Sequence, residues 1–164
     1  MNNGIAKKVA IGGITAALAV VLMCLGTMIP LATFVCPLLC MILLSMVLRF
    51  TDVKIAWSWY VAVCVLGLLL SPDKEAASTF VFLGYYPIIK PYLDRLKLAV
   101  LWKMLLFNAA IGAMYATLIW IFGMDTLLAE FAEMGTILCV VTLVLGNICL
   151  FIFDYLLTRM RKLR

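Results

Sequence analysis

Long apolar runs separated by short polar links are the dominant pattern along the chain. A helix needs about 20 predominantly apolar residues to cross a bilayer, and six runs come close to or exceed that length. The pattern predicts transmembrane helices at about residues 8–29, 31–48, 55–71, 75–93, 102–123 and 135–158. No repeat, low-complexity tract or long polar linker divides the chain. We therefore expect an all-α fold with a single transmembrane domain, a six-transmembrane-helix bundle over residues 1–164.

Local signals refine these boundaries. Pro30 should stop the first helix. Trp57, Trp59 and Tyr60 stand where an aromatic belt at the lipid headgroups is expected. The fourth segment is the least hydrophobic, and Pro87 and Pro91 within it lack amide hydrogens, so this helix should kink or end there.

Composition places the chain in a membrane. Hydrophobic residues make up 67% of it and charged residues 13%, with a mean hydropathy of +1.20, which leaves too little polar surface to cover a water-soluble globule. If the six segments cross a membrane in turn, twelve of the thirteen lysines and arginines lie on one side of it and only Lys74 lies on the other. By the positive-inside rule we expect a multi-pass membrane protein with both termini in the cytoplasm. The cations lie at helix ends and short loops, where anionic lipid accounts for them, so nucleic acid is not an expected partner.

The six cysteines all lie inside apolar segments, where packing is the simplest interpretation. Cys36 and Cys40 are one helical turn apart and could share a metal, but the chain has no histidine and no other cysteine nearby. We expect no metal site and no cofactor. Without histidine, paired glutamates or an Asp-Gly-rich phosphotransferase signature, we also predict no catalytic residues and no enzymatic activity.

Small residues form one face of the first segment. Gly12 and Ala16, and likewise Gly13 and Ala17, are spaced as small-xxx-small pairs, which let helix backbones approach closely in lipid. The pattern indicates a partner helix. Spacing leaves open whether that helix belongs to this chain or to another protein.

A polar stripe follows the fourth segment. Its members are Glu75, Thr79, Phe82, Tyr86 and Lys90, in steps of four, three, four and four residues, which places them on one helix face. Polar groups at membrane depth are costly, so the stripe should point inward. It could line a small-molecule pocket or form a buried helix contact.

Polar residues on the last two segments offer further candidates. Asn147 lies near mid-membrane and should find partners in a ligand or in Tyr85 or Tyr86. Asn108 and Asp154 lie at similar distances from the inner ends of their helices and could pair. Asp154 could instead reach a cation at the lipid interface, so a structural role is favoured for it.

The outer links are acidic, with Lys74 as their only cation. If an external pocket exists, this field favours a small neutral or cationic solute; otherwise the acids form a solvated rim. The predicted ligand-binding residues are Glu75, Thr79, Phe82, Tyr86, Asn147 and Lys74.

The double lysine, the run Ile11-Gly12-Gly13-Ile14-Thr15-Ala16-Ala17 and the six short-linked segments together resemble the S components of energy-coupling factor (ECF) transporters. That resemblance implies uptake of a vitamin-like or cofactor-precursor solute, with an ECF coupling subunit and ATPases as partners. It also implies that the face of Gly12, Gly13, Ala16 and Ala17 docks the coupling subunit. The 71–75 turn and the 84–87 stretch are similar to an uncharacterised family of small bacterial membrane proteins.

A second class has the same size and helix number. Rod-shape-determining proteins of the MreD type are non-transporting membrane scaffolds or assembly proteins. In that class, the face on the first segment and the fourth segment would bind other membrane proteins, and no solute pocket is needed.

Overall fold

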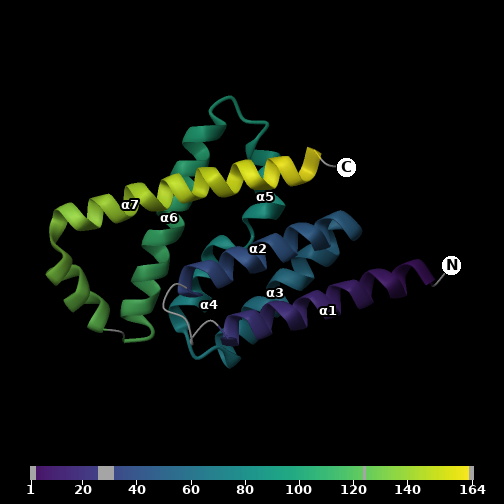
Figure 1. Ribbon diagram of the computed structural model, residues 1–164, viewed down its shortest axis with the longest axis horizontal. Helices are drawn as coiled ribbons and strands as arrows, with labels where there is room; N and C mark the ends of the chain where they lie inside the picture. The colour runs from purple at the N-terminus through teal and green to yellow at the C-terminus, as the bar shows by residue number, and fades with distance from the viewer. Residues whose placement is uncertain (1–2, 26–31, 124, 163–164) are drawn as a thin grey trace. The chain divides into compact units, whose positions relative to one another are not determined.

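The computed structural model describes the backbone of residues 3–25, 32–123 and 125–162, and the side chains of residues 6–25, 34–123, 135 and 137–160. All regular structure in these ranges is helical (Figure 1). The helices are α1 (Asn3–Leu25), α2 (Ala32–Phe50), α3 (Val53–Leu70), α4 (Lys74–Leu83), α5 (Tyr86–Leu93), α6 (Ala99–Trp120) and α7 (Asp125–Lys162). The predicted stop at Pro30 lies outside the described residues.

Four helical stretches are long and apolar enough to cross a membrane. They are Ala6–Leu25, Val53–Leu70, Ala99–Trp120 and Ile137–Met160. α2 adds a shorter apolar stretch, Phe34–Phe50. Large apolar side chains such as Ile14, Leu69 and Ile137 are exposed along these helices, as suits contact with lipid. The chain is thus an all-helical membrane protein.

The structure differs from the predicted segments in two regions. The fourth segment consists of two short helices, α4 and α5, instead of one span. Residues 125–133, predicted as an acidic loop, are helical and form the start of α7. Leucine, alanine and glutamate all favour helix, and the negative charge of glutamate does not prevent it. α7 is interrupted at Gly135, whose φ of 70° and ψ of 162° are accessible mainly to glycine. The acidic side chains of that first stretch lie outside the described residues.

The chain divides into two compact units, Met1–Leu96 with α1 to α5 and Lys97–Arg164 with α6 and α7. Each has its own interhelical contacts and is described separately below. The expectation of one domain over residues 1–164 stays a prediction.

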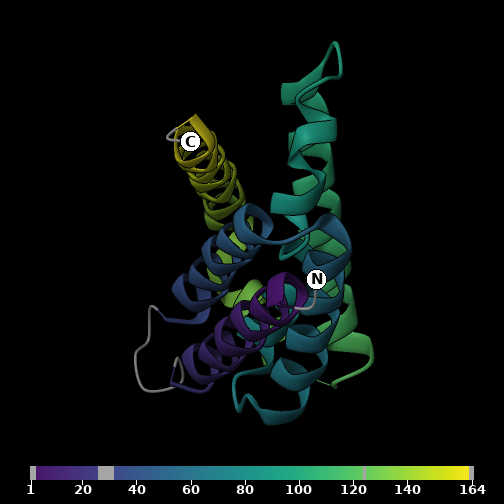
Figure 2. The same ribbon diagram turned by 90° about the vertical axis from the view of Figure 1, so that its right-hand side faces the viewer.

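In the first unit α1 and α3 run parallel, with α2 antiparallel to both (Figures 1 and 2). At one end Lys8 on α1 pairs with Asp52, which precedes α3, at 2.9 Å. At the other end the hydroxyl of Ser71, just after α3, donates to the carbonyl of Met23 on α1 at 3.3 Å. The helices approach closely at Gly67, where an added Cβ would lie 2.8 Å from the sulfur of Met23. Glycine at this position therefore permits the α1–α3 packing.

The aromatic residues at the start of α3 divide between two environments. Trp57 is exposed, as expected of a headgroup belt. Trp59 is only 4% exposed, and its indole N–H donates to the hydroxyl of Thr15 on α1 at 3.1 Å. The belt prediction is wrong for Trp59, because it faces α1 and its N–H finds a partner inside the unit.

Candidate functional site

In the first unit, α4 and α5 are separated by a two-residue break at Gly84 and Tyr85, both of which keep right-handed helical dihedral angles. α4 ends at Leu83, and the amide of Gly84 donates to the carbonyl of Phe80 as the last bond of that helix. Pro87 then occupies the second position of α5, where it has no amide hydrogen to offer the carbonyl of Leu83. The expected interruption near Pro87 is confirmed. Pro91, by contrast, is accommodated within α5.

The break corrects the predicted polar stripe. Glu75, Thr79 and Phe82 lie on α4, whereas Tyr86 and Lys90 lie on α5. A regular spacing in sequence aligns residues on one face only while the helix is continuous. The five residues are therefore not one uninterrupted helical stripe.

Gly84 allows the chain to turn here. A Cβ on this residue would lie against the carbonyl of Phe80 and 2.8 Å from its ring. The Phe80 side chain therefore folds over the end of its own helix, in space that any other residue would fill. Sequence reasoning did not identify Gly84 as a site residue.

A tyrosine from α3 satisfies a backbone group at the break. The hydroxyl of Tyr60 donates to the carbonyl of Val81, in the last turn of α4. Carbonyls at the end of a helix have no intrahelical donor, and lipid supplies none, so a side chain must take that role. Tyr60 thereby supports the break. The sequence carried no signal for this contact, since it joins two segments 21 residues apart.

Aromatic rings from α3, from α4 and from the turn between α4 and α5 gather around Tyr60. Its ring centroid lies 5.8 Å from that of Phe80, 6.1 Å from that of Tyr85 and 5.8 Å from that of Trp57. Trp59 meets Phe80 edge-on at 6.3 Å. Edge and tilted contacts at these distances are favourable for aromatic pairs. An aromatic cluster thus joins α3, α4 and the turn before α5. We define it as Trp57, Trp59, Tyr60, Phe80 and Tyr85.

The predicted inward orientation is confirmed for part of the stripe. Thr79 is buried, and Tyr86 is only 2% exposed. The Thr79 hydroxyl donates to the carbonyl of Glu75 at 2.9 Å. Glu75 and Phe82 are partly exposed. A solute pocket at this face stays a prediction, as does the alternative of a buried helix contact.

Lys74, predicted to contact a ligand, has a structural position at the turn before α4. Its ammonium donates to the carbonyl of Leu68 at 2.7 Å and to that of Ser71 at 3.1 Å, and so caps the end of α3. Asp73 caps the start of α4 by accepting from the amide of Ala76 at 2.9 Å. The turn therefore fixes the direction in which α4 leaves α3.

Lys90 on α5 is a buried cation, 2% exposed. Its ammonium lies 3.6 Å from a carboxylate oxygen of Asp94, one turn further along. A buried charge is tolerated only when other groups compensate it. The Lys90–Asp94 ion pair contributes that compensation at the end of the first unit.

In the second unit Asn147 pairs with Asn108 across α6 and α7. Each side-chain amide donates to the other's oxygen, at 3.3 Å from Asn108 and 3.1 Å from Asn147. Each also donates to a carbonyl four residues earlier, at Met104 and Leu143. Asn147 thus has a partner in its own unit that was not predicted. The predicted partners, a ligand or the first-unit residues Tyr85 or Tyr86, stay predictions.

The ammonium of Lys103 on α6 donates to a carboxylate oxygen of Asp154 on α7 at 2.9 Å. The prediction that Asn108 pairs with Asp154 is wrong, because the antiparallel register sets Asp154 opposite Lys103. The alternative expectation was a cation at the lipid interface; the observed partner is instead the buried ammonium of Lys103, and this pairing supports the structural role expected of Asp154. Lys103 is buried and Asp154 partly buried, so the helix hairpin contains a partly buried ion pair.

The small face of α1 divides into two parts. Gly12 is buried, and a Cβ there would lie 3.9 Å from Ile55 on α3. Ala16 is partly buried. Gly13 and Ala17 are exposed, and no atom lies within 4 Å of the position a Cβ would take on Gly13. One part packs inside the chain, and the other, defined here as the Gly13–Ala17 face, is available to lipid or to another helix.

Cys36 and Cys40 are both buried on α2. The thiol of Cys40 donates to the carbonyl of Ala19 on α1 at 3.5 Å. In the part of the chain that the structure describes, no group of three or more potential metal ligands comes together. The observed contact gives Cys40 a packing role.

A hollow in the first unit is lined by none of the predicted ligand residues. Its walls are Lys8, Asp52, Val53, Lys54 and Ile55, at the opposite end of α3 from the turn that precedes α4.

Comparisons of the chain with protein-family models, with curated proteins and with solved structures give no match.

Proposed function

We propose that the chain is the solute-binding membrane subunit of an uptake transporter of the energy-coupling-factor type, for a small vitamin-like or cofactor-precursor solute. The observation that carries the proposal is the break between α4 and α5 inside a membrane protein. Discontinuous helices recur at the solute sites of transporters. Irregular backbone at membrane depth is otherwise costly, and is tolerated where protein or a cavity surrounds it.

In this proposal Phe82 and Tyr86 flank the solute, and Thr79 and Glu75 orient its polar or cationic group. Thr79 and Tyr86 are buried, so entry of a solute displaces the segment, and the break at Gly84 lets α5 move relative to α4. Lys74 does not bind the solute directly, because its ammonium is engaged in capping α3. Asn147 is engaged with Asn108 in the second unit and is not part of this site.

The proposed arrangement in the cell has six membrane crossings and both termini in the bacterial cytoplasm. α4 and α5 together make the fourth crossing. The coupling subunit docks on the Gly13–Ala17 face of α1, since close helix contact in lipid depends on small residues. Gly12 is not part of that docking surface, because it packs against α3.

Native purification from mild detergent tests the proposal. Mass spectrometry of the retained proteins and small molecules should identify a coupling subunit, two ATPases and a bound solute. Tyr86→Ala should lose the solute and keep the proteins, whereas the exposed control Tyr92→Ala should keep both. Recovery of the protein with no ATPase and no solute would exclude a transport role.

A second candidate is a non-transporting scaffold, similar to proteins of the MreD type. The dense packing of α4 favours it, because consecutive side chains from Ala76 to Phe80 are buried against neighbouring helices. A scaffold requires stable helices and an exposed docking face, and no solute-accessible volume. The same purification separates the two candidates, since a scaffold should retain other membrane proteins without ATPases.

A further inference from the structure

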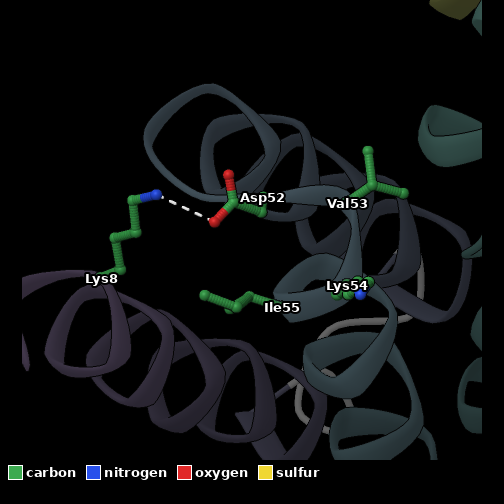
Figure 3. A pocket seen from close by; sticks show the side chains of 5 residues that line it. All are labelled: Lys8, Asp52, Val53, Lys54 and Ile55. Atoms are coloured by element: carbon green, nitrogen blue, oxygen red, sulfur yellow. Dashed lines mark hydrogen bonds and ion pairs between the residues drawn. The ribbon is translucent and has the colours of Figure 1, made fainter. Parts of the chain in front are cut away.

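A hollow of about 630 Å³ lies where α1 begins and α2 gives way to α3 (Figure 3). Figure 3 shows Lys8 on α1 extending toward Asp52, with Ile55 directed into the space between the two helices. Val53 and Lys54, in the first turn of α3, complete the lining. The volume lies within the range of roughly 300–1,000 Å³ that is typical of small-molecule sites.

The charges at this hollow are unequal. Its lining has two lysines and one aspartate. The carboxylate of Asp52 is engaged by Lys8 at 2.9 Å and makes no capping bond to α3. Among the described residues no ion pair involves Lys54, and the neighbouring cations Lys7 and Arg49 are exposed. The hollow therefore carries a surplus of positive charge.

Apolar side chains surround the same place. Val53 lines the hollow and is exposed, as are Val9 on α1 and Phe50 at the end of α2. α1 and α3 are both among the helices able to cross a membrane, and the hollow lies at the ends of both. Cations at a helix end beside apolar, lipid-facing surface match the two parts of a phospholipid.

We propose that this hollow binds the phosphate of an anionic phospholipid headgroup. Lys54 and Lys8 contact the phosphate, while Val53 and Ile55 contact the glycerol and the upper acyl chains. Basic pockets between membrane helices bind headgroups in this way. Asp52 limits the affinity because it competes with the phosphate for Lys8. This site goes beyond solute uptake or scaffolding, since neither requires a bound lipid.

The test uses the full-length protein in a neutral detergent. Native mass spectrometry and thermal unfolding are measured with phosphatidylglycerol, with phosphatidylcholine of the same acyl chains, and with glycerol 3-phosphate. We expect saturable retention and stabilisation with phosphatidylglycerol alone. Lys54→Gln should weaken binding about fivefold, the equivalent of about 1 kcal/mol per basic residue near an anionic membrane. Lys97→Gln, which removes the same charge from an exposed position in the second unit, should not.

Asp52→Asn should change the affinity for phosphatidylglycerol in the opposite direction to Lys54→Gln. It releases Lys8, so it should strengthen binding of phosphatidylglycerol, an outcome that a loss of folding cannot imitate. Equal binding of phosphatidylcholine, equal effects of Lys54→Gln and Lys97→Gln, or weaker binding by Asp52→Asn would each overturn the proposal. Stabilisation by glycerol 3-phosphate equal to that by phosphatidylglycerol would identify a site for free phosphate esters and also overturn it.

Discussion

The hydroxyl of Tyr60 on α3 donates to the backbone carbonyl of Val81 at the point where α4 is about to end. A side chain thus replaces an amide as the donor to a helix carbonyl in a membrane protein. The ring that bears this hydroxyl also contacts Phe80 and Tyr85, on either side of the break. One residue of α3 therefore contributes both a hydrogen bond and apolar contact to the same interruption.

Tyr60→Phe tests the hydrogen bond alone, since the ring contacts remain. Leaving a buried carbonyl without a donor costs about 1 to 3 kcal/mol, and the Val81 carbonyl is partly buried, so the free energy of unfolding in detergent should fall by about 1 kcal/mol. Tyr92→Phe is the matched control, because Tyr92 is 62% exposed on α5, and it should change stability by less than about 0.5 kcal/mol. Equal stability of the two variants would show that the bond contributes nothing.

Gly84→Ala tests the close approach at the break. The added Cβ meets both the carbonyl and the ring of Phe80, and overpacking of this kind costs about 1 to 3 kcal/mol. Gly112→Ala on α6 is the control, because no atom lies within 4 Å of its Cβ position. There, alanine should be neutral or stabilise the helix by up to about 1 kcal/mol. Thermal unfolding that ranks the two variants the other way would contradict the described geometry.

The Asn108–Asn147 pair invites a double-mutant cycle. Replacing either residue by leucine leaves the other amide with only its own-helix carbonyl, so each single variant should lose stability. Interhelical hydrogen bonds in membranes average about 0.6 kcal/mol, with a maximum near 1.7. We expect a coupling energy in that range from the two singles and the double variant. Strictly additive losses would mean that the two amides act independently.

Gly12 and Gly13 are adjacent in sequence but should respond differently to leucine. Gly12→Leu intrudes on the contact with Ile55 and should destabilise the isolated protein by about 1 to 3 kcal/mol. Gly13→Leu points into open space and should leave the fold intact while abolishing association with a partner helix. Unfolding and co-purification, measured on both variants, separate these outcomes. Retained association of Gly13→Leu would remove the Gly13–Ala17 face as the docking surface.

Topology can be checked by cysteine labelling in a background without the native cysteines. Pro72→Cys, in the exposed turn between α3 and α4, should be labelled only from outside the cell. Arg95→Cys, exposed after α5, should be labelled only from the cytoplasmic side. The reverse pattern would contradict the proposed orientation of the first unit.

The apolar pattern was sufficient to predict the four helices that are long and apolar enough to cross a membrane, because a run of about 20 apolar residues has few alternatives. It also located the weak fourth segment through its prolines. It could not place the break at Gly84, since that depends on how the ring of Phe80 folds back. It did not predict the helix at residues 125–133, because an acidic segment between two apolar runs is also typical of a loop.

The polar partners were harder to predict for a different reason. The pairing of Asp154 with Lys103 and of Asn147 with Asn108 depends on the antiparallel register of two helices, which a helical period does not contain. Tyr60 and Lys103 were missed as site-building residues, although matching depth from the helix ends could have suggested Lys103. The small face of α1 was recognised, but its division between Gly12 and Gly13 depends on where α3 lies.

The parallel packing of α1 and α3 has a consequence for synthesis. Contacts between Lys8 and Asp52 and between Thr15 and Trp59 join helices that cannot pair as a simple hairpin, since the whole of α2 separates them in the sequence. During insertion, α1 must therefore wait until α3 has left the ribosome before these bonds form. A nascent chain that ends within α2 would hold α1 without its main partner, exposed to chaperones and membrane proteases until synthesis resumes.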